Sequence, residues 1–276
     1  MLTERSTAGE VAIHYVLDGS GPPLLLVHGV TKTWRSWLPI LPQLSERWRV
    51  IAPDLRGHGA SARTPGHYQV QEIAQDLARL LEASAEGPAT VVAHSLGGAV
   101  ALHLAAEHPD LVARLVLEDP LLDLDLVYRH PIATMMFPAM LGILRENRTP
   151  ETIAPALLAT FPDVSGAPPE MLRAWVEELA ALDPEALAST IDRSILAGHD
   201  PIALLGQVRA PTLILRADPA SGGFVPDIAA SAARQAGAEV VECPGLSHEM
   251  HEQDPRLVLD TLEAWLQQEP ARRANG

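Results

Sequence analysis

The chain has 276 residues, 47% of them hydrophobic, which is enough to bury a sizeable core in one large domain or two small ones. Its formal net charge of -15 would repel nucleic acid, and the single cysteine, Cys243, excludes an intrachain disulfide. The polar N-terminal stretch and the absence of a run of membrane-spanning length predict a cytoplasmic protein without a membrane segment.

Seven short apolar segments predict β-strands. They are rich in Val, Ile and Leu without strict polar alternation, which is typical of parallel strands buried on both faces. Helix-length segments, such as 70–84 and 97–110, lie between several of them. This alternation predicts an α/β fold around a mostly parallel sheet. The predicted strands are 11–17, 23–29, 49–57, 90–95, 114–120, 211–218 and 239–245.

The pattern changes between residues 121 and 205, where proline-punctuated apolar helices such as 133–147 and 169–182 replace the strands. We expect residues 121–205 to form a helical cap, inserted after the sixth strand of a core made of residues 1–120 and 206–270. Such a cap would cover the carboxyl ends of the strands, where open α/β sheets bind ligands. Residues 271–276 lack apolar periodicity and predict a disordered tail.

Ser95 lies where a predicted strand ends and a helix begins at once. The sequence there is Val91-Val-Ala-His-Ser-Leu-Gly-Gly98, with the small residues Ala93 and Gly97 two positions on either side of the serine. This spacing matches the nucleophile elbow G-x-S-x-G, with alanine in place of the first glycine. The alternative interpretation is a serine that only caps the helix.

Three further motifs accompany the elbow. A strand ends in His28-Gly29, residues 54–61 read Asp-Leu-Arg-Gly-His-Gly-Ala-Ser, and residues 245–248 read Gly-Leu-Ser-His. Together with Ser95 these motifs resemble the α/β-hydrolase superfamily, and in particular its serine esterases and lactonases. The resemblance implies an eight-stranded, mostly parallel sheet flanked by helices, with a helical cap.

The resemblance also implies catalytic roles. Ser95 would be the nucleophile and His248 the general base, while the backbone amides of Val30 and Leu96 would form the oxyanion hole. His251 is the rival base, but it lacks the glycine placement of the motif, and we interpret it as part of the following helix.

Two aspartates compete for the acid of the triad. Asp218 follows the seventh strand, the usual family position, but a glycine pair separates it from the Val-Pro pair that normally follows closely. Asp119 ends the sixth strand, where zearalenone-type lactonases and many haloalkane dehalogenases carry the acid. We favour Asp119 over Asp218, and we expect Glu118 to point to the opposite side of the strand. Either aspartate could instead be a turn carboxylate before proline.

A serine at the elbow, rather than an aspartate, excludes the epoxide hydrolase and dehalogenase branches and leaves acyl transfer. The sequence therefore predicts a serine hydrolase that cleaves an ester or lactone of an apolar small molecule without a cofactor. Alternatives are C–C bond hydrolysis or perhydrolysis on the same triad, or a slow-turnover ligand receptor of this fold. No pair of histidines has metal-ligand spacing with a matching carboxylate, so no metal is expected.

Methionine and tryptophan in and near the predicted cap suggest an apolar pocket, although such residues are more often plain core. We expect a monomer or homodimer that binds a small molecule and neither nucleic acid nor membrane. The candidate substrate-binding residues are Gly29, Trp34, His94, Met136 and Trp175.

Overall fold

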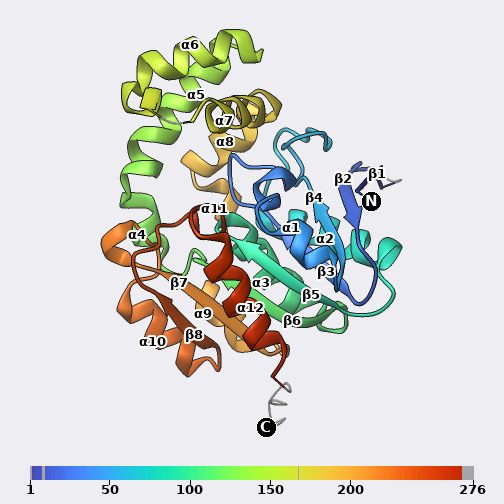
Figure 1. Cartoon of the computed structure of the whole chain (residues 1–276). Coiled ribbons are helices and arrows are strands. Elements are labelled where there is room, and N and C mark those ends of the chain that lie inside the picture. Colours follow the sequence, from blue (N-terminus) through green and yellow to red (C-terminus); the bar gives the residue numbers. More distant parts are fainter. Residues whose placement is uncertain (1, 8–9, 167, 269–276) are drawn as a thin grey trace.

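The structure is a computed structural model, which describes residues 2–7, 10–166 and 168–268 (Figure 1). One eight-stranded sheet runs through the molecule in the order β1-β2-β4-β3-β5-β6-β7-β8. The pairs β1–β2 and β2–β4 are antiparallel, and all the others are parallel. The strands are β1 Thr3–Ser6, β2 His14–Asp18, β3 Pro23–Val27, β4 Arg49–Pro53, β5 Ala89–His94, β6 Val112–Glu118, β7 Thr212–Ala217 and β8 Glu239–Cys243.

The predicted fold class is confirmed, and strands β2 to β8 fall on the seven predicted segments. The eighth strand, β1, was not among those segments. Its sequence is Thr-Glu-Arg-Ser and all four residues are exposed, because β1 is the edge strand of the sheet. An exposed polar edge strand has no apolar pattern by which it could be recognised.

Both faces of the sheet are buried, which explains the continuous apolar runs. In β3, Leu25 and Val27 pack into one core cluster, whereas Leu24 and Leu26 pack into another on the opposite face. Four helices cover the first face: α2 Val70–Ser84, α3 Leu96–Glu107, α9 Pro201–Gln207 and α10 Asp227–Gln235. The short helix α1 Leu41–Ser45 and the helix α12 Pro255–Leu266 cover the second.

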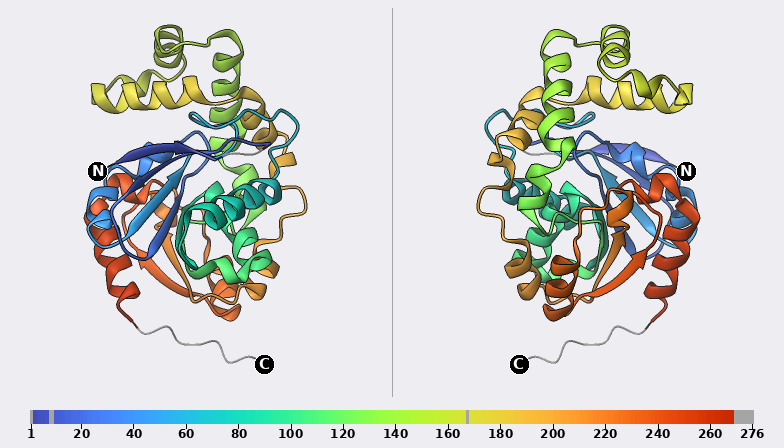
Figure 2. Two further views of the ribbon diagram at one scale, coloured as in Figure 1. Left: turned by 90° about the vertical axis from the view of Figure 1, so that its right-hand side faces the viewer. Right: turned by 90° about the vertical axis from the view of Figure 1, so that its left-hand side faces the viewer.

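A group of helices between β6 and β7 stands away from the sheet, as both views in Figure 2 show. Its apolar side chains form a third core cluster, which includes Phe137 and Leu187. We call this group the cap. It comprises α4 Leu124–Arg129, the π-helix η3 Ile132–Met136, α5 Phe137–Glu146, α6 Pro150–Thr160, η4 Pro162–Gly166, α7 Pro169–Ala181, α8 Pro184–Ile191 and η5 Ser194–Leu196.

The predicted boundary between residues 205 and 206 falls inside α9. Leu205 of this helix packs with the cluster on the sheet, so α9 belongs with the sheet layer rather than with the cap. The predicted tail at 271–276 lies outside the described residues. A search of the described helices finds none with the length and apolarity needed to cross a bilayer.

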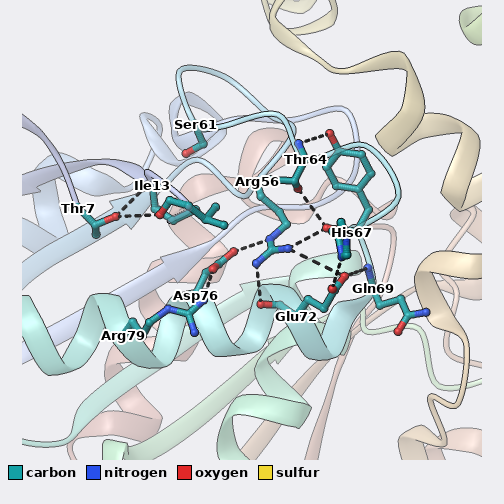
Figure 3. Close-up of polar contacts among 12 residues, drawn as sticks. Thr7, Ile13, Arg56, Ser61, Thr64, His67, Gln69, Glu72, Asp76 and Arg79 are labelled. Atoms are coloured by element: carbon teal, nitrogen blue, oxygen red, sulfur yellow. Dashed lines mark hydrogen bonds and ion pairs between the residues drawn. The ribbon is translucent and has the colours of Figure 1, made fainter. Parts of the chain in front are cut away.

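The loop after β4 is fixed by a buried ion pair. The Arg56 guanidinium donates to Asp76 of α2 at 2.6 Å and to the backbone oxygen of His67 at 2.9 Å, and Arg79 bonds the other oxygen of Asp76 (Figure 3). The same loop holds the cap, because the Asp183 amide donates to Gly57 O at 2.7 Å. The 54–61 motif is therefore scaffold that joins the sheet, α2 and the cap.

Candidate active site

The loops that follow β5, β6 and β8 bring together three residues from distant parts of the chain. His248 Nε2 lies 2.9 Å from Ser95 Oγ, and His248 Nδ1 lies 2.6 Å from Asp119 Oδ2. Because a carboxylate only accepts, Nδ1 carries the proton and Nε2 is left to accept from the serine hydroxyl. This is the arrangement in which an imidazole can remove the proton of a serine.

Ser95 is held on a strained turn. Its backbone has φ 55° and ψ -119°, a conformation that non-glycine residues rarely adopt. Gly97 allows the turn, since a Cβ there would lie 2.5 Å from Val27 O. Ser95 occupies the N-cap position of α3, but its side chain makes no capping hydrogen bond. The side chain is therefore left to interact with His248, which argues against a serine that only caps the helix.

Asp119 is fully buried and sits just beyond β6, with a positive φ of 41°. Its Oδ2 also accepts a hydrogen bond of 2.8 Å from the Phe224 amide, and the Phe224 ring packs edge-on against His248 at 4.5 Å. Phe224 follows the glycine pair after β7. The loop after β7, which carries the alternative acid Asp218, thus donates a hydrogen bond to Asp119 through Phe224.

Asp218, the alternative acid, makes other contacts. Its carboxylate accepts from the amides of Ala220 and Gly245, both at 2.9 Å, and so joins the loops after β7 and β8. These backbone hydrogen bonds lower the pKa of Asp218. Of the two candidate acids, Asp119 is the one that is hydrogen-bonded to His248.

The amides of Val30 and Leu96 border the same space. Leu96 is the first residue of α3, where a backbone N–H has no partner within the helix, and Val30 follows the end of β3. Within the described chain neither amide donates to a protein acceptor. Gly29 allows the close approach of this loop, since a Cβ there would lie 3.1 Å from Ser95 Cβ.

A cavity with about 730 Å³ of empty space opens above Ser95 and is roofed by the cap. Its polar lining includes Thr31, Thr190, Tyr128 and Glu249, and no lysine or arginine of the described part of the chain lines it. The sequence offered no motif for Tyr128 or Phe224, because cap and loop residues carry no signal beyond composition. Besides Val30 and Leu96, the apolar lining residues are Leu121, Val127, Ile132, Ala133, Met136, Phe137, Ile195, Leu196 and Phe224.

Of the predicted substrate-binding residues, Met136 and His94 line this cavity. His94 Nε2 donates to His248 O at 2.9 Å, and burial lowers the pKa of His94 to about 4, so its ring is neutral. Trp175 instead lines an adjoining open groove, which shares Met136 and Glu249 with the cavity.

Trp34, also expected to bind substrate, does not line this cavity. Its indole is buried in the core cluster beneath the sheet, and it lines a separate cavity with Asp54 rather than the one above Ser95. The physical reason is the short helix η1 Trp34–Trp37, whose tryptophans pack inward, with the Trp34 amide donating to Asp54 at 3.0 Å.

Comparison with known proteins decides the family. A family model described as alpha/beta hydrolase fold matches residues 22–255. The chain belongs to the α/β-hydrolase family. It is therefore a hydrolase, and its relatives differ in what they hydrolyse.

This hydrolase is 26% identical over 275 residues to a 2-(acetamidomethylene)succinate hydrolase of Mesorhizobium japonicum, covering 95% of this chain and 94% of that one. A soluble epoxide hydrolase of Corynebacterium sp. is 39% identical over 107 residues, which are 39% of this chain and only 37% of the relative. A solved structure of E-2-(acetamidomethylene)succinate hydrolase superposes with a TM-score of 0.79 at 24% identity, covering 97% of this chain and 100% of the other.

A buried glutamate of the cap contacts the loop that follows β3. Glu178 of α7 accepts, through Oε1, both the amide and the hydroxyl hydrogen of Thr33, each at 3.1 Å. Thr33 lies on the loop that carries Val30. Burial raises the pKa of Glu178 to about 7, even though the nearby Lys32 charge acts to lower it.

Among the described residues, no group of three or more histidine, cysteine or acidic side chains is arranged to hold a metal.

The Glu178 pKa predicts a stability effect. A carboxyl whose pKa rises to about 7 on folding adds stability at low pH and loses that contribution as the pH rises through this value. Glu178→Gln keeps the oxygen that Thr33 needs but cannot ionise. The variant's excess in free energy of unfolding over wild type should therefore widen by ~1–3 kcal/mol between about pH 5 and about pH 8.

Urea denaturation at several pH values measures this difference, with Glu177→Gln at the exposed neighbouring position as the control. A difference between Glu178→Gln and wild type that stays constant across this range would contradict the assignment.

Proposed function

We propose that this hydrolase cleaves a carboxylic ester or lactone through an acyl-enzyme on Ser95, without a cofactor. The observation that carries the proposal is the hydrogen-bonded series from Ser95 Oγ through His248 to the buried Asp119. The two unpaired amides of Val30 and Leu96 beside it supply what an acyl-transfer site needs for a developing oxyanion.

In the first half of the reaction, Ser95 Oγ attacks the carbonyl carbon while His248 Nε2 takes the hydroxyl proton. Asp119 stabilises the imidazolium, and the amides of Val30 and Leu96 donate to the oxyanion. The bond to the leaving oxygen then breaks, and His248 returns the proton to that oxygen. Water adds to the acyl-enzyme with His248 as base, which releases the acid and restores Ser95.

The cavity lining favours a neutral, apolar substrate. Most lining residues are aliphatic or aromatic, Glu249 is already paired with Lys32 at 3.4 Å, and among the described residues no arginine or lysine lines the cavity to pair with a carboxylate. The Mesorhizobium relative is named for a succinate derivative, which carries carboxylates. The absence of a cation from this lining argues for a different substrate here.

The proposal is tested with two p-nitrophenyl esters whose acyl chains have equal length, the pentanoate and the hemiglutarate. We expect kcat/KM to be at least ~10-fold higher for the neutral pentanoate, because the carboxylate of the hemiglutarate would lose its hydration in a mostly apolar cavity. A series of lactones of increasing ring size distinguishes lactonase from esterase activity.

Equal or faster turnover of the hemiglutarate would contradict the neutral-substrate assignment. Binding of esters with a single slow turnover would favour a receptor over an enzyme, and cleavage of none of the esters or lactones would leave C–C bond hydrolysis and perhydrolysis as the activities to assay.

A further inference from the structure

A second acid–histidine pair lies directly behind the first. Glu118 is the last residue of β6, and its carboxylate contacts His251, whereas that of the next residue, Asp119, contacts His248. Glu118 Oε2 lies 2.8 Å from His251 Nδ1, and Glu118 Oε1 accepts from the His251 amide at 2.7 Å. Both side chains are fully buried.

The contact has the character of an ion pair. Burial acts to raise the pKa of Glu118, but the charge and hydrogen bonds of His251 outweigh it and hold that pKa below its ordinary value. Burial likewise acts to lower the pKa of His251, and Glu118 reverses the direction and raises it. The Trp37 ring stacks on His251 with centroids 4.2 Å apart, which fixes the orientation of the imidazole.

The pair anchors the four-residue segment 248–251 that begins with His248. His94 lies between the two ends, since its Nε2 donates to His248 O and its ring meets His251 edge-on at 5.3 Å. The contacts that hold the segment include Asp119 on the His248 ring, His94 on the His248 carbonyl, the Lys32–Glu249 ion pair, and Glu118 on the side chain and amide of His251.

We propose that Glu118 and His251 are positioning residues, which hold the main chain of His248 so that its ring spans the gap between Asp119 and Ser95. This inference rests on the proposed role of His248 as the base. Glu118 and Asp119 are consecutive residues at the end of β6. This strand end therefore fixes both the His248 ring, through Asp119, and the backbone that carries His248, through Glu118 and His251. A buried ion pair adds little net stability compared with apolar packing, so orientation is the better account of its presence.

The test uses Glu118→Gln and His251→Gln. Glutamine places an NH2 group where one of the two accepting oxygens of Glu118 stood, and that group cannot accept from His251. We expect kcat per active site to fall ~10–100-fold in each variant, with KM within about threefold of wild type. A p-nitrophenyl phosphonate that labels Ser95 counts the active sites.

A second readout does not depend on turnover. The proton shared by His248 Nδ1 and Asp119 should give a downfield ¹H NMR resonance in wild type, and this resonance should shift or broaden in both variants. Asp76→Asn is the matched control, because Asp76 belongs to an equally buried ion pair with Arg56, away from this segment (Figure 3). It should lower the unfolding midpoint while leaving kcat per site and the resonance unchanged.

Unchanged kcat per site and an unchanged resonance in both glutamine variants would overturn the inference, and the proposed function would stand. If wild type hydrolyses neither esters nor lactones, the proposed function fails, and the resonance alone then decides whether the pair positions His248. Should the glutamine variants not fold, Glu118→Asp keeps the charge but withdraws the carboxylate by one methylene. It should lower kcat in the same way, and full activity in that variant would equally refute the inference.

Discussion

Ser95→Ala is expected to lower kcat for the preferred ester by roughly 10⁴- to 10⁶-fold, with KM little changed. The substitution removes the atom that attacks the carbonyl, and without it His248 has no proton to take. The turn itself should persist, because alanine also fits between Gly97 and the end of β5 and Ser95 makes no capping bond that would be lost. Any residual rate would come from the amides of Val30 and Leu96 and from substrate binding.

The measurement is steady-state hydrolysis of p-nitrophenyl pentanoate, accompanied by mass spectrometry after phosphonate treatment. Wild type should gain one phosphonyl group and Ser95→Ala none. Ser84→Ala is the control, since Ser84 bonds only Leu80 O near the end of α2. If Ser95→Ala retained a tenth of the wild-type rate, the acyl-enzyme mechanism would have to be abandoned.

The second large effect is expected at Asp119. Asp119→Asn should lower kcat by about 10⁴-fold, because an amide in this place can donate to His248 Nδ1 and so favours the wrong tautomer of the imidazole. The loss should appear in kcat more than in KM, since Asp119 is fully buried beneath His248 and does not line the cavity.

Asp218→Asn is the matched comparison. It changes an aspartate on the adjacent strand end that contacts two backbone amides and not His248, so kcat should remain within about threefold of wild type. Its unfolding midpoint should fall slightly, because two charge-assisted hydrogen bonds weaken. A collapse of kcat in Asp218→Asn with a nearly active Asp119→Asn would reverse the assignment of the acid.

The strands and the elbow were predictable because their signals are local. A run of Val, Ile and Leu identifies a buried strand, and the spacing of Ala93, Ser95 and Gly97 identifies the turn between strand and helix. The sequence did not decide which aspartate is the acid of the triad, because that choice depends on contacts between distant segments. Asp119 and Asp218 end neighbouring strands, and which of them reaches His248 depends on the path of the loop through Phe224, which no short pattern encodes.

Contacts between distant residues were missed for the same reason. Strand alternation predicts that Glu118 points away from Asp119, but its partner His251 lies more than a hundred residues later, and nothing in either segment indicates the pairing. The sequence does not indicate which cavity Trp34 lines, because a tryptophan between two predicted elements carries no information about the side on which it packs. The lining of the cavity comes largely from cap helices, whose apolar residues look alike whether they face a ligand or a neighbouring helix.

The separate apolar cluster inside the cap has an evolutionary consequence. Residues such as Leu157 and Leu179 belong to this cluster and to neither of the clusters on the sheet, so we expect the size of such side chains to change with little effect on the strand ends that carry Ser95 and Asp119. Mutations there would reshape the chamber wall while the reacting groups keep their places. Proteins descended from one ancestor can in this way acquire new substrates through substitutions in the cap alone, while the residues at the strand ends stay the same.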